Sequence, residues 1–165
     1  IPENTAVGAK PGKARLRVPD NAARTHATLS GSPDGDNGVE VTVSVLADYA
    51  ANHGIVRFDV MKIDVEGSEL MVVHGAAGLL AMKVPPVLIV EAAANTAEGF
   101  GYGPNALLDA IGDDYRFCII DESRGRLTPF HRFPDGHIGA NVLALPRERS
   151  NVSKRLVQAG LLPQG

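Results

Sequence analysis

Strict alternation of apolar and polar residues marks two segments in the first third of the chain. Valine stands at every second position of residues 39–45, and acidic or hydroxyl side chains fill the positions between. Successive side chains of a strand point to opposite faces, so this pattern predicts a strand with one face in water. Residues 14–18 alternate between apolar side chains and arginines, which predicts a second half-exposed strand.

Apolar runs later in the chain predict the strands of the core. These runs cover residues 58–65, 87–90, 117–120 and 140–145. Residues 126–130 also favour a strand, but Pro129 lacks the N–H group that a central ladder needs. We therefore expect residues 126–130 at the edge of the sheet.

Helices are predicted between these strands, over residues 46–52, 68–82, 104–111 and 151–162. In the second of these helices, Gly75 and Gly78 each cost about 1 kcal/mol relative to Ala, which suggests that both allow close packing on the sheet. Strands separated by helices predict a mostly parallel sheet. The sequence thus predicts an α/β fold, in a single domain over residues 1–165.

The stretch from residue 58 to residue 70 combines a buried strand with charged residues. Lys62, Asp64 and Glu66 recur at every second position, which places them on one face of an extended chain. A buried strand admits charges cheaply only near its end. Gly67 then permits a tight turn, and Ser68 is placed to cap the next helix. This order predicts a ligand site at the carboxyl edge of an open α/β sheet.

Composition limits the classes of protein to which the chain can belong. The 165 residues are 44% hydrophobic, enough for a real core, and the net charge of −3 with scattered basic residues argues against a nucleic-acid partner. The longest apolar run, residues 84–94, is too short to span a bilayer, so no membrane partner is expected. The single cysteine, Cys118, cannot form an internal disulfide, which favours a cytoplasmic location.

The run Asp-Val-Met-Lys-Ile-Asp-Val-Glu-Gly-Ser-Glu at residues 59–69 resembles the signature of the FkbM-type methyltransferases, which use S-adenosylmethionine. The resemblance continues through residues 74–76, 86–91 and 140–145. The family's first motif, an Asp-x-Gly-Ala-Asn-type loop that holds the cofactor, does not occur in the sequence. Residues 1–8 instead resemble the segment around the third strand.

This resemblance implies a Rossmann-like class I methyltransferase sheet, mostly parallel with an antiparallel edge. It also implies that the chain corresponds to the C-terminal part of such a domain and lacks its N-terminal strands. We therefore expect the chain by itself to bind S-adenosylmethionine weakly. We also expect an unpaired sheet edge and an exposed apolar patch, which would favour self-association.

Candidate catalytic residues are Asp64, Glu66 and Glu91, all expected at the carboxyl ends of core strands. In the family that the chain resembles, the end of the central strand lies beside the cofactor and the acceptor, which implies cofactor contacts for Asp64 and, from the N-terminal segment, for Ala6. Asp64 could orient the donor, bind the acceptor or help remove a proton, or else form a buried ion pair with Lys62. Glu66 could act as general base, contact the cofactor or cap backbone amides.

Two of the histidines are further candidates for the general base. His131 and His137 flank a turn before the last strand, and either could serve if that loop folds over the site.

The resemblance implies methyl transfer from S-adenosylmethionine to the hydroxyl oxygen of a small molecule or sugar. Two alternatives remain. Asp64, Glu66 and Glu91 could hold a divalent cation in a carboxylate-metal hydrolase. The missing cofactor loop favours a non-catalytic remnant or binding module.

Overall fold

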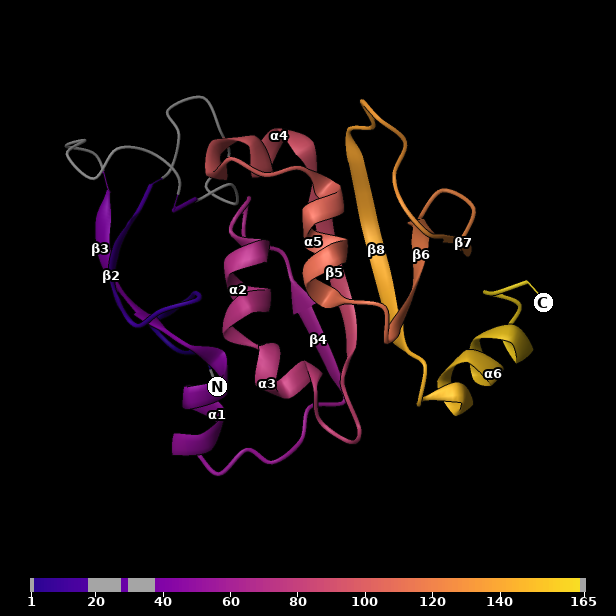
Figure 1. Cartoon of the computed structure of the whole chain (residues 1–165), viewed down its shortest axis with the longest axis horizontal. Coiled ribbons are helices and arrows are strands. Elements are labelled where there is room, and N and C mark those ends of the chain that lie inside the picture. Colours follow the sequence, from indigo (N-terminus) through magenta and orange to yellow (C-terminus); the bar gives the residue numbers. More distant parts are fainter. Residues whose placement is uncertain (1, 18–27, 30–37, 164–165) are drawn as a thin grey trace.

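A computed structural model of the chain describes residues 2–17, 28–29 and 38–163. A small three-stranded sheet comes first in the sequence and lies at one side of the molecule (Figure 1). Its strand order is β1-β3-β2, with β1 parallel and β2 antiparallel to β3. The elements are β1 (Ala6–Val7), β2 (Gly12–Leu16) and β3 (Val39–Ser44), followed by α1 (Leu46–Asn52). Both alternating segments, residues 14–18 and 39–45, therefore form strands, although residue 18 lies outside the described residues.

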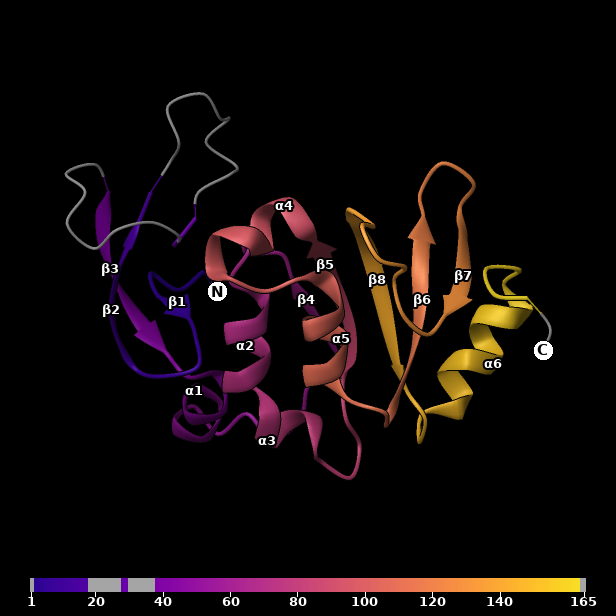
Figure 2. The same cartoon turned by 45° about the horizontal axis from the view of Figure 1, so that its top comes forward.

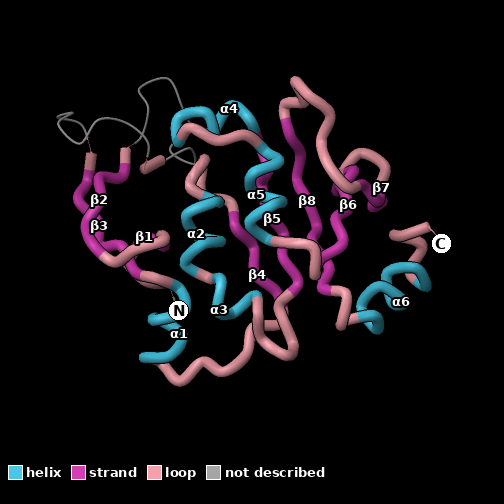
Figure 3. The backbone as a smooth tube through the Cα atoms, viewed as in Figure 1, coloured by secondary structure: helices cyan, strands magenta, loops and turns pink. Residues whose placement is uncertain are grey.

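A five-stranded sheet forms the centre of the fold, in the order β4-β5-β8-β6-β7 (Figures 1 and 3). Only β4 and β5 pair in parallel, while β8 runs antiparallel to both β5 and β6, and β7 antiparallel to β6. Its strands are β4 (Val60–Ile63), β5 (Val87–Ala93), β6 (Tyr115–Asp121), β7 (Arg126–Phe130) and β8 (Gly139–Pro146). The predicted edge strand is confirmed, because β7 stands last in the order.

The prediction of a mostly parallel sheet is wrong, and the position of β8 explains why. Helices connect β4 to β5 and β5 to β6, and these three strands do run in one direction. The last strand, β8, inserts between β5 and β6 and replaces one parallel pairing with two antiparallel ones. The four-residue turn between β6 and β7 adds a third, since so short a connection makes a hairpin. The sheet is therefore mixed.

Helices cover the two faces of this sheet unequally (Figure 2). On one face, α2 (Glu69–Gly75), α3 (Ala77–Leu80) and α5 (Pro104–Ile111) enclose the main core. Its best buried members include Leu88, Val90, Leu107 and Val142. On the other face, α6 (Ser150–Gln158) covers a smaller cluster around Cys118.

Several predicted boundaries differ from the structure. The predicted helix 68–82 is two helices, α2 and α3, which meet at Ala76. Gly75 packs closely as expected, but against the N-terminal segment, since a Cβ there would lie 2.2 Å from the Gly8 carbonyl oxygen. Gly78 faces open space, so its predicted packing role is wrong. The segment 92–103, where neither a strand nor a helix was predicted, contains the end of β5, the short α4 (Ala94–Ala97) and a 3-10 turn, Glu98–Phe100.

Candidate functional site

A pocket of about 420 Å³ lies where β4 ends beside the small sheet. Asp64, Glu66 and Ser68 line it from the segment after β4, and Ala6 lines it from β1. The remaining lining side chains come from both parts of the fold: Glu3, Asn4, Thr5, Val7, Leu16, Leu29, Val41 and Val65. The structure thus brings three of the predicted site residues, Ala6, Asp64 and Glu66, to one cavity.

Asp64 is the first residue after β4, and its side chain is 41% exposed. The carboxylate accepts a hydrogen bond from Lys62, so the predicted ion pair exists, but at the surface rather than in the interior. The hydrogen bond from Lys62 to Asp64 raises the pKa of Lys62, as do the negative charges of Asp64 and Glu91. Lys62 therefore stays charged and acts as a counter-ion.

Glu66 has an unusual backbone conformation. Its φ of +53° lies in the left-handed region, the only such case among the described non-glycine residues. The Thr28 hydroxyl donates to the Glu66 carbonyl oxygen over 2.9 Å, which helps to hold this turn. Because the strand ends at Ile63, Glu66 does not continue the strand alternation, yet the turn carries it to the same pocket as Asp64.

The turn is fixed from inside by Glu69, whose side chain is almost wholly buried, with the residue only 1% exposed. One carboxylate oxygen, Oε1, accepts hydrogen bonds from the backbone N–H groups of Val65 at 2.9 Å and Gly67 at 3.2 Å. A buried carboxylate is tolerated when such donors satisfy it. Glu69 is thus the structural anchor of residues 64–68.

Tyr102 reaches the same turn from the segment before α5. Its hydroxyl oxygen lies 2.6 Å from the Gly67 carbonyl oxygen and 3.2 Å from Oε2 of Glu69, so its single proton has two acceptors within range. The Leu70 N–H group donates to the same hydroxyl over 3.3 Å. Burial raises the pKa of Tyr102, and the negative charge of Glu69 raises it further, so the hydroxyl remains a donor.

Gly67 allows the chain to turn beneath this anchor. Its φ is +101°, and a Cβ at this position would lie only 2.2 Å from the Thr96 carbonyl oxygen. The predicted tight turn at Gly67 is therefore confirmed. The predicted cap is wrong, since the Ser68 side chain makes no capping bond and its hydroxyl donates to the Val65 carbonyl oxygen over 3.0 Å.

Residues 3–129, more than half of the chain, match the model of the Methyltransferase FkbM domain. The chain belongs to this family. No curated protein and no solved structure gives a significant match. The matched segment of this FkbM-family protein contains the pocket residues, the turn at Gly67 and both anchoring side chains, Glu69 and Tyr102.

Glu91 does not line this pocket. It stands opposite Asn141 within β5, two residues before the strand ends, because β5 continues to Ala93. The predicted place at the end of the strand is therefore wrong. Glu91 is near enough to Lys62 to act on its pKa.

Neither candidate histidine lines the pocket of the FkbM-family protein. His131 lines a different cavity, and His137 accepts a hydrogen bond at Nδ1 from the Gly139 N–H group. No group of three His, Cys, Asp or Glu side chains in the described ranges is arranged to hold a metal ion. Across those same ranges, none of the helices has the length and apolar character that a membrane span requires.

Sequence reasoning missed Glu69 and Tyr102 as parts of the site. An acidic residue directly after a serine at the start of a predicted helix was a signal for Glu69, since helix N-termini favour carboxylates. Tyr102 gave no comparable signal, because its partners lie more than thirty positions away in the sequence.

Proposed function

We propose that this FkbM-family chain transfers a methyl group from S-adenosylmethionine to a hydroxyl oxygen of a small molecule or sugar. The observation that carries the proposal is the convergence of Ala6, Asp64 and Glu66 on one pocket within the segment that matches the family. Family membership supports methyl transfer in general. The proposal adds the identity of the methyl donor and the hydroxyl nature of the acceptor.

The residues around the pocket suit a positively charged donor with apolar parts. Glu3, Asp64 and Glu66 supply carboxylates, and no lysine or arginine is among the lining residues that the structure describes. Val7, Leu16, Val41 and Val65 supply apolar surface. When bound, S-adenosylmethionine would supply the methyl group as a sulfonium cation, which carboxylates stabilise and cationic side chains would repel.

Asp64 is proposed to bind the α-ammonium group of the donor, which S-adenosylhomocysteine also carries. Its hydrogen bond from Lys62 orients the carboxylate and leaves further lone pairs available. Ala6 lines the pocket from β1 with a small side chain, so a ligand can approach the backbone there. The chain's contribution to rate would be to position donor and acceptor in line, which can supply much of an enzyme's acceleration.

Glu66 is proposed as the group that accepts the acceptor's proton. It lines the same pocket as Asp64, and the Glu69 anchor holds the turn that carries it. A base must reach the proton that it removes, so geometry is the first requirement. Glu91 has a weaker claim to a catalytic role, because it is not among the residues that line this pocket.

The two alternative functions are unequally supported. A carboxylate-metal hydrolase needs Asp64, Glu66 and Glu91 to converge as ligands, and the described residues contain no such group. A binding module without catalysis needs only the pocket. It is therefore the alternative that the experiment must separate from methyl transfer.

The test measures transfer of a radiolabelled methyl group to a panel of hydroxyl compounds, with the donor at millimolar concentration because weak binding is expected. Ligand-observed NMR with S-adenosylhomocysteine measures binding in parallel. Asp64→Asn should reduce the rate of methyl transfer and the affinity for S-adenosylhomocysteine by about tenfold each, as expected for the loss of one charge-assisted hydrogen bond. Asp135→Asn, a change at an exposed aspartate outside the pocket, is the matched control and should alter neither.

The outcomes distinguish the three functions. Methyl transfer that survives a chelator and falls in Asp64→Asn supports the proposal. Binding of S-adenosylhomocysteine without transfer to any acceptor supports a binding module. Transfer that Asp64→Asn leaves unchanged contradicts the role of Asp64, and activity that needs added magnesium favours the metal enzyme.

A further inference from the structure

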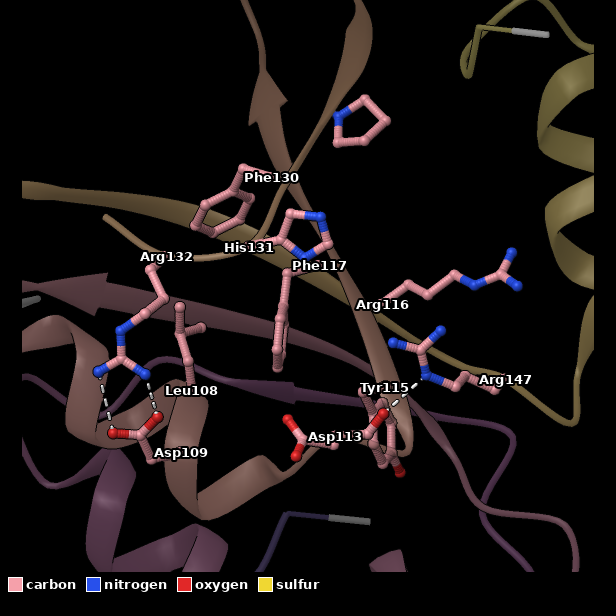
Figure 4. Close-up of a pocket in the computed structure, with 11 residues that line it drawn as sticks. Leu108, Asp109, Asp113, Tyr115, Arg116, Phe117, Phe130, His131, Arg132 and Arg147 are labelled. Atoms are coloured by element: carbon pink, nitrogen blue, oxygen red, sulfur yellow. Dashed lines mark hydrogen bonds and ion pairs between the residues drawn. The ribbon is translucent and has the colours of Figure 1, made fainter. Parts of the chain in front are cut away.

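A second pocket, of about 400 Å³, lies between the end of α5, the start of β6 and the end of β7 (Figure 4). It shares no lining residue with the pocket at Asp64. Its volume falls in the range of small-molecule sites, about 300–1,000 Å³. The proposed methyl transfer makes no use of it.

Aromatic side chains form one wall of this second pocket. Phe117 of β6 and Phe130 of β7 stand opposite each other in the strand register, with ring centroids 6.3 Å apart. Both are only partly buried, so ring surface remains available to a ligand. Leu108 and Pro129 extend the apolar lining. This wall suits a flat apolar group.

Two arginines that line this second pocket have unused hydrogen-bond donors. The side chain of Arg116 is exposed and makes no hydrogen bond or ion pair with any described residue. Arg147 donates from Nε to the Asp113 carbonyl oxygen over 2.7 Å, which positions its guanidinium and leaves both terminal nitrogens free among the described residues. Arg132, in contrast, is taken up by a two-pronged ion pair with Asp109, at 2.5 and 3.2 Å.

The two available guanidinium groups lie on the same side of the pocket, whereas the Arg132–Asp109 pair lies on the other side (Figure 4). Guanidinium groups with free donors suit a phosphate, which accepts paired hydrogen bonds. Asp113 also lines the pocket and carries the opposing charge. Its repulsion would reduce, but not cancel, the attraction of two arginines.

We propose that this pocket binds a small aromatic compound that carries a phosphate ester. The ring would lie against Phe117 and Phe130, and the phosphate would accept hydrogen bonds from Arg116 and Arg147. Arrangements of this kind, with an apolar wall and a few convergent polar groups, are typical of ligand sites. The ligand is a small molecule rather than nucleic acid, because the chain's net charge is −3.

The test titrates the 165-residue chain with phenyl phosphate and follows backbone amide signals by NMR. Signals of Phe117 and Phe130 should shift, and they should not shift with benzyl alcohol, which has the ring without the charge. Arg116→Gln should weaken phenyl phosphate binding about tenfold, as expected for a charge-assisted pair. Arg155→Gln, at an exposed arginine on α6 outside the pocket, is the matched control.

Asp113→Asn provides an independent check, because it removes the repulsive charge. Its expected effect is tighter binding of phenyl phosphate. Since Arg116 has no partner to lose, Arg116→Gln should fold normally, and its amide spectrum verifies this. No shift at 10 mM phenyl phosphate, equal weakening in Arg155→Gln, or weaker binding in Asp113→Asn would overturn the proposal. Equally tight binding of inorganic phosphate would overturn the aromatic part of it.

Discussion

Replacing Glu69 is the sharpest test of how the turn at residues 64–68 is held. In Glu69→Ala, the N–H groups of Val65 and Gly67 lose their acceptor in a part of the molecule that water reaches poorly. An unsatisfied buried group costs about 1–3 kcal/mol. The loss of both bonds should therefore lower the free energy of unfolding by about 2–6 kcal/mol, a large part of the stability of about 5–15 kcal/mol that a typical domain has.

Glu69→Gln should be much milder, and the difference between the two variants tests the reasoning. The glutamine oxygen can accept both backbone hydrogen bonds. Its amide group can donate a hydrogen bond to the Tyr102 hydroxyl oxygen, and that hydroxyl can donate its own hydrogen bond to the Gly67 carbonyl oxygen. Only the added strength of a charged acceptor is lost, about 1 kcal/mol.

Urea unfolding followed by circular dichroism measures these free energies. Glu98→Ala is the control, because Glu98 is exposed and makes no side-chain bond with the described residues. If Glu69→Ala unfolds within 1 kcal/mol of the unchanged chain, or if Gln and Ala cost the same, then the carboxylate does not hold the turn and the reasoning fails.

Three further predictions follow from other parts of the structure. Gly67→Ala should destabilise the chain by about 3 kcal/mol or more, because the position has a positive φ and a Cβ there would contact Thr96. Gly54→Ala, where φ is also positive but the space is open, should cost about 1 kcal/mol. Equal decreases in melting temperature in the two variants would contradict this. Hydrogen bonds from Ser123 and Arg124 lower the pKa of Asp121 to about 2, so its stabilising contribution is present above about pH 4 and is lost as pH falls toward 2. In Asp121→Asn, the melting temperature should therefore fall less steeply between about pH 4 and pH 2 than in the unchanged chain. An equally steep fall in both would refute this prediction. Val60 is 56% exposed on β4, at the end of the strand order, so Val60→Lys should reduce self-association in light scattering. A monomeric unchanged chain would refute the expected self-association, and equal self-association of the two chains would refute the edge as its cause.

The sequence predicted those parts of the fold that depend on local chemistry. The apolar run, the glycine turn and the following helix at residues 58–70 are encoded by neighbours, so β4, Gly67 and α2 lie close to their predicted places. The pairing of β8 depends on which strands lie beside it in space, and an apolar run carries no record of its partners. The direction of most sheet pairings was therefore beyond local reasoning.

The residues of the candidate site likewise fall into those that the sequence predicted and those that only the structure revealed. Asp64 and Glu66 were found because charges at alternate positions stand out in an apolar strand, and Ala6 was found through the family resemblance. Glu91 was misplaced because β5 continues through small residues that carry no strand signal. The anchor formed by Glu69 and Tyr102 joins residues from distant parts of the chain, and only the folded structure reveals it.

The central position of β8 also has a consequence for the order of events on the ribosome. Strands β4 and β5 emerge early and β6 and β7 later, but in the strand order only β8 joins the two pairs. The sheet therefore cannot close until residue 146 has left the exit tunnel. Until then, both β5 and β6 present an unpaired edge to other nascent chains, which is when chaperone binding would matter most.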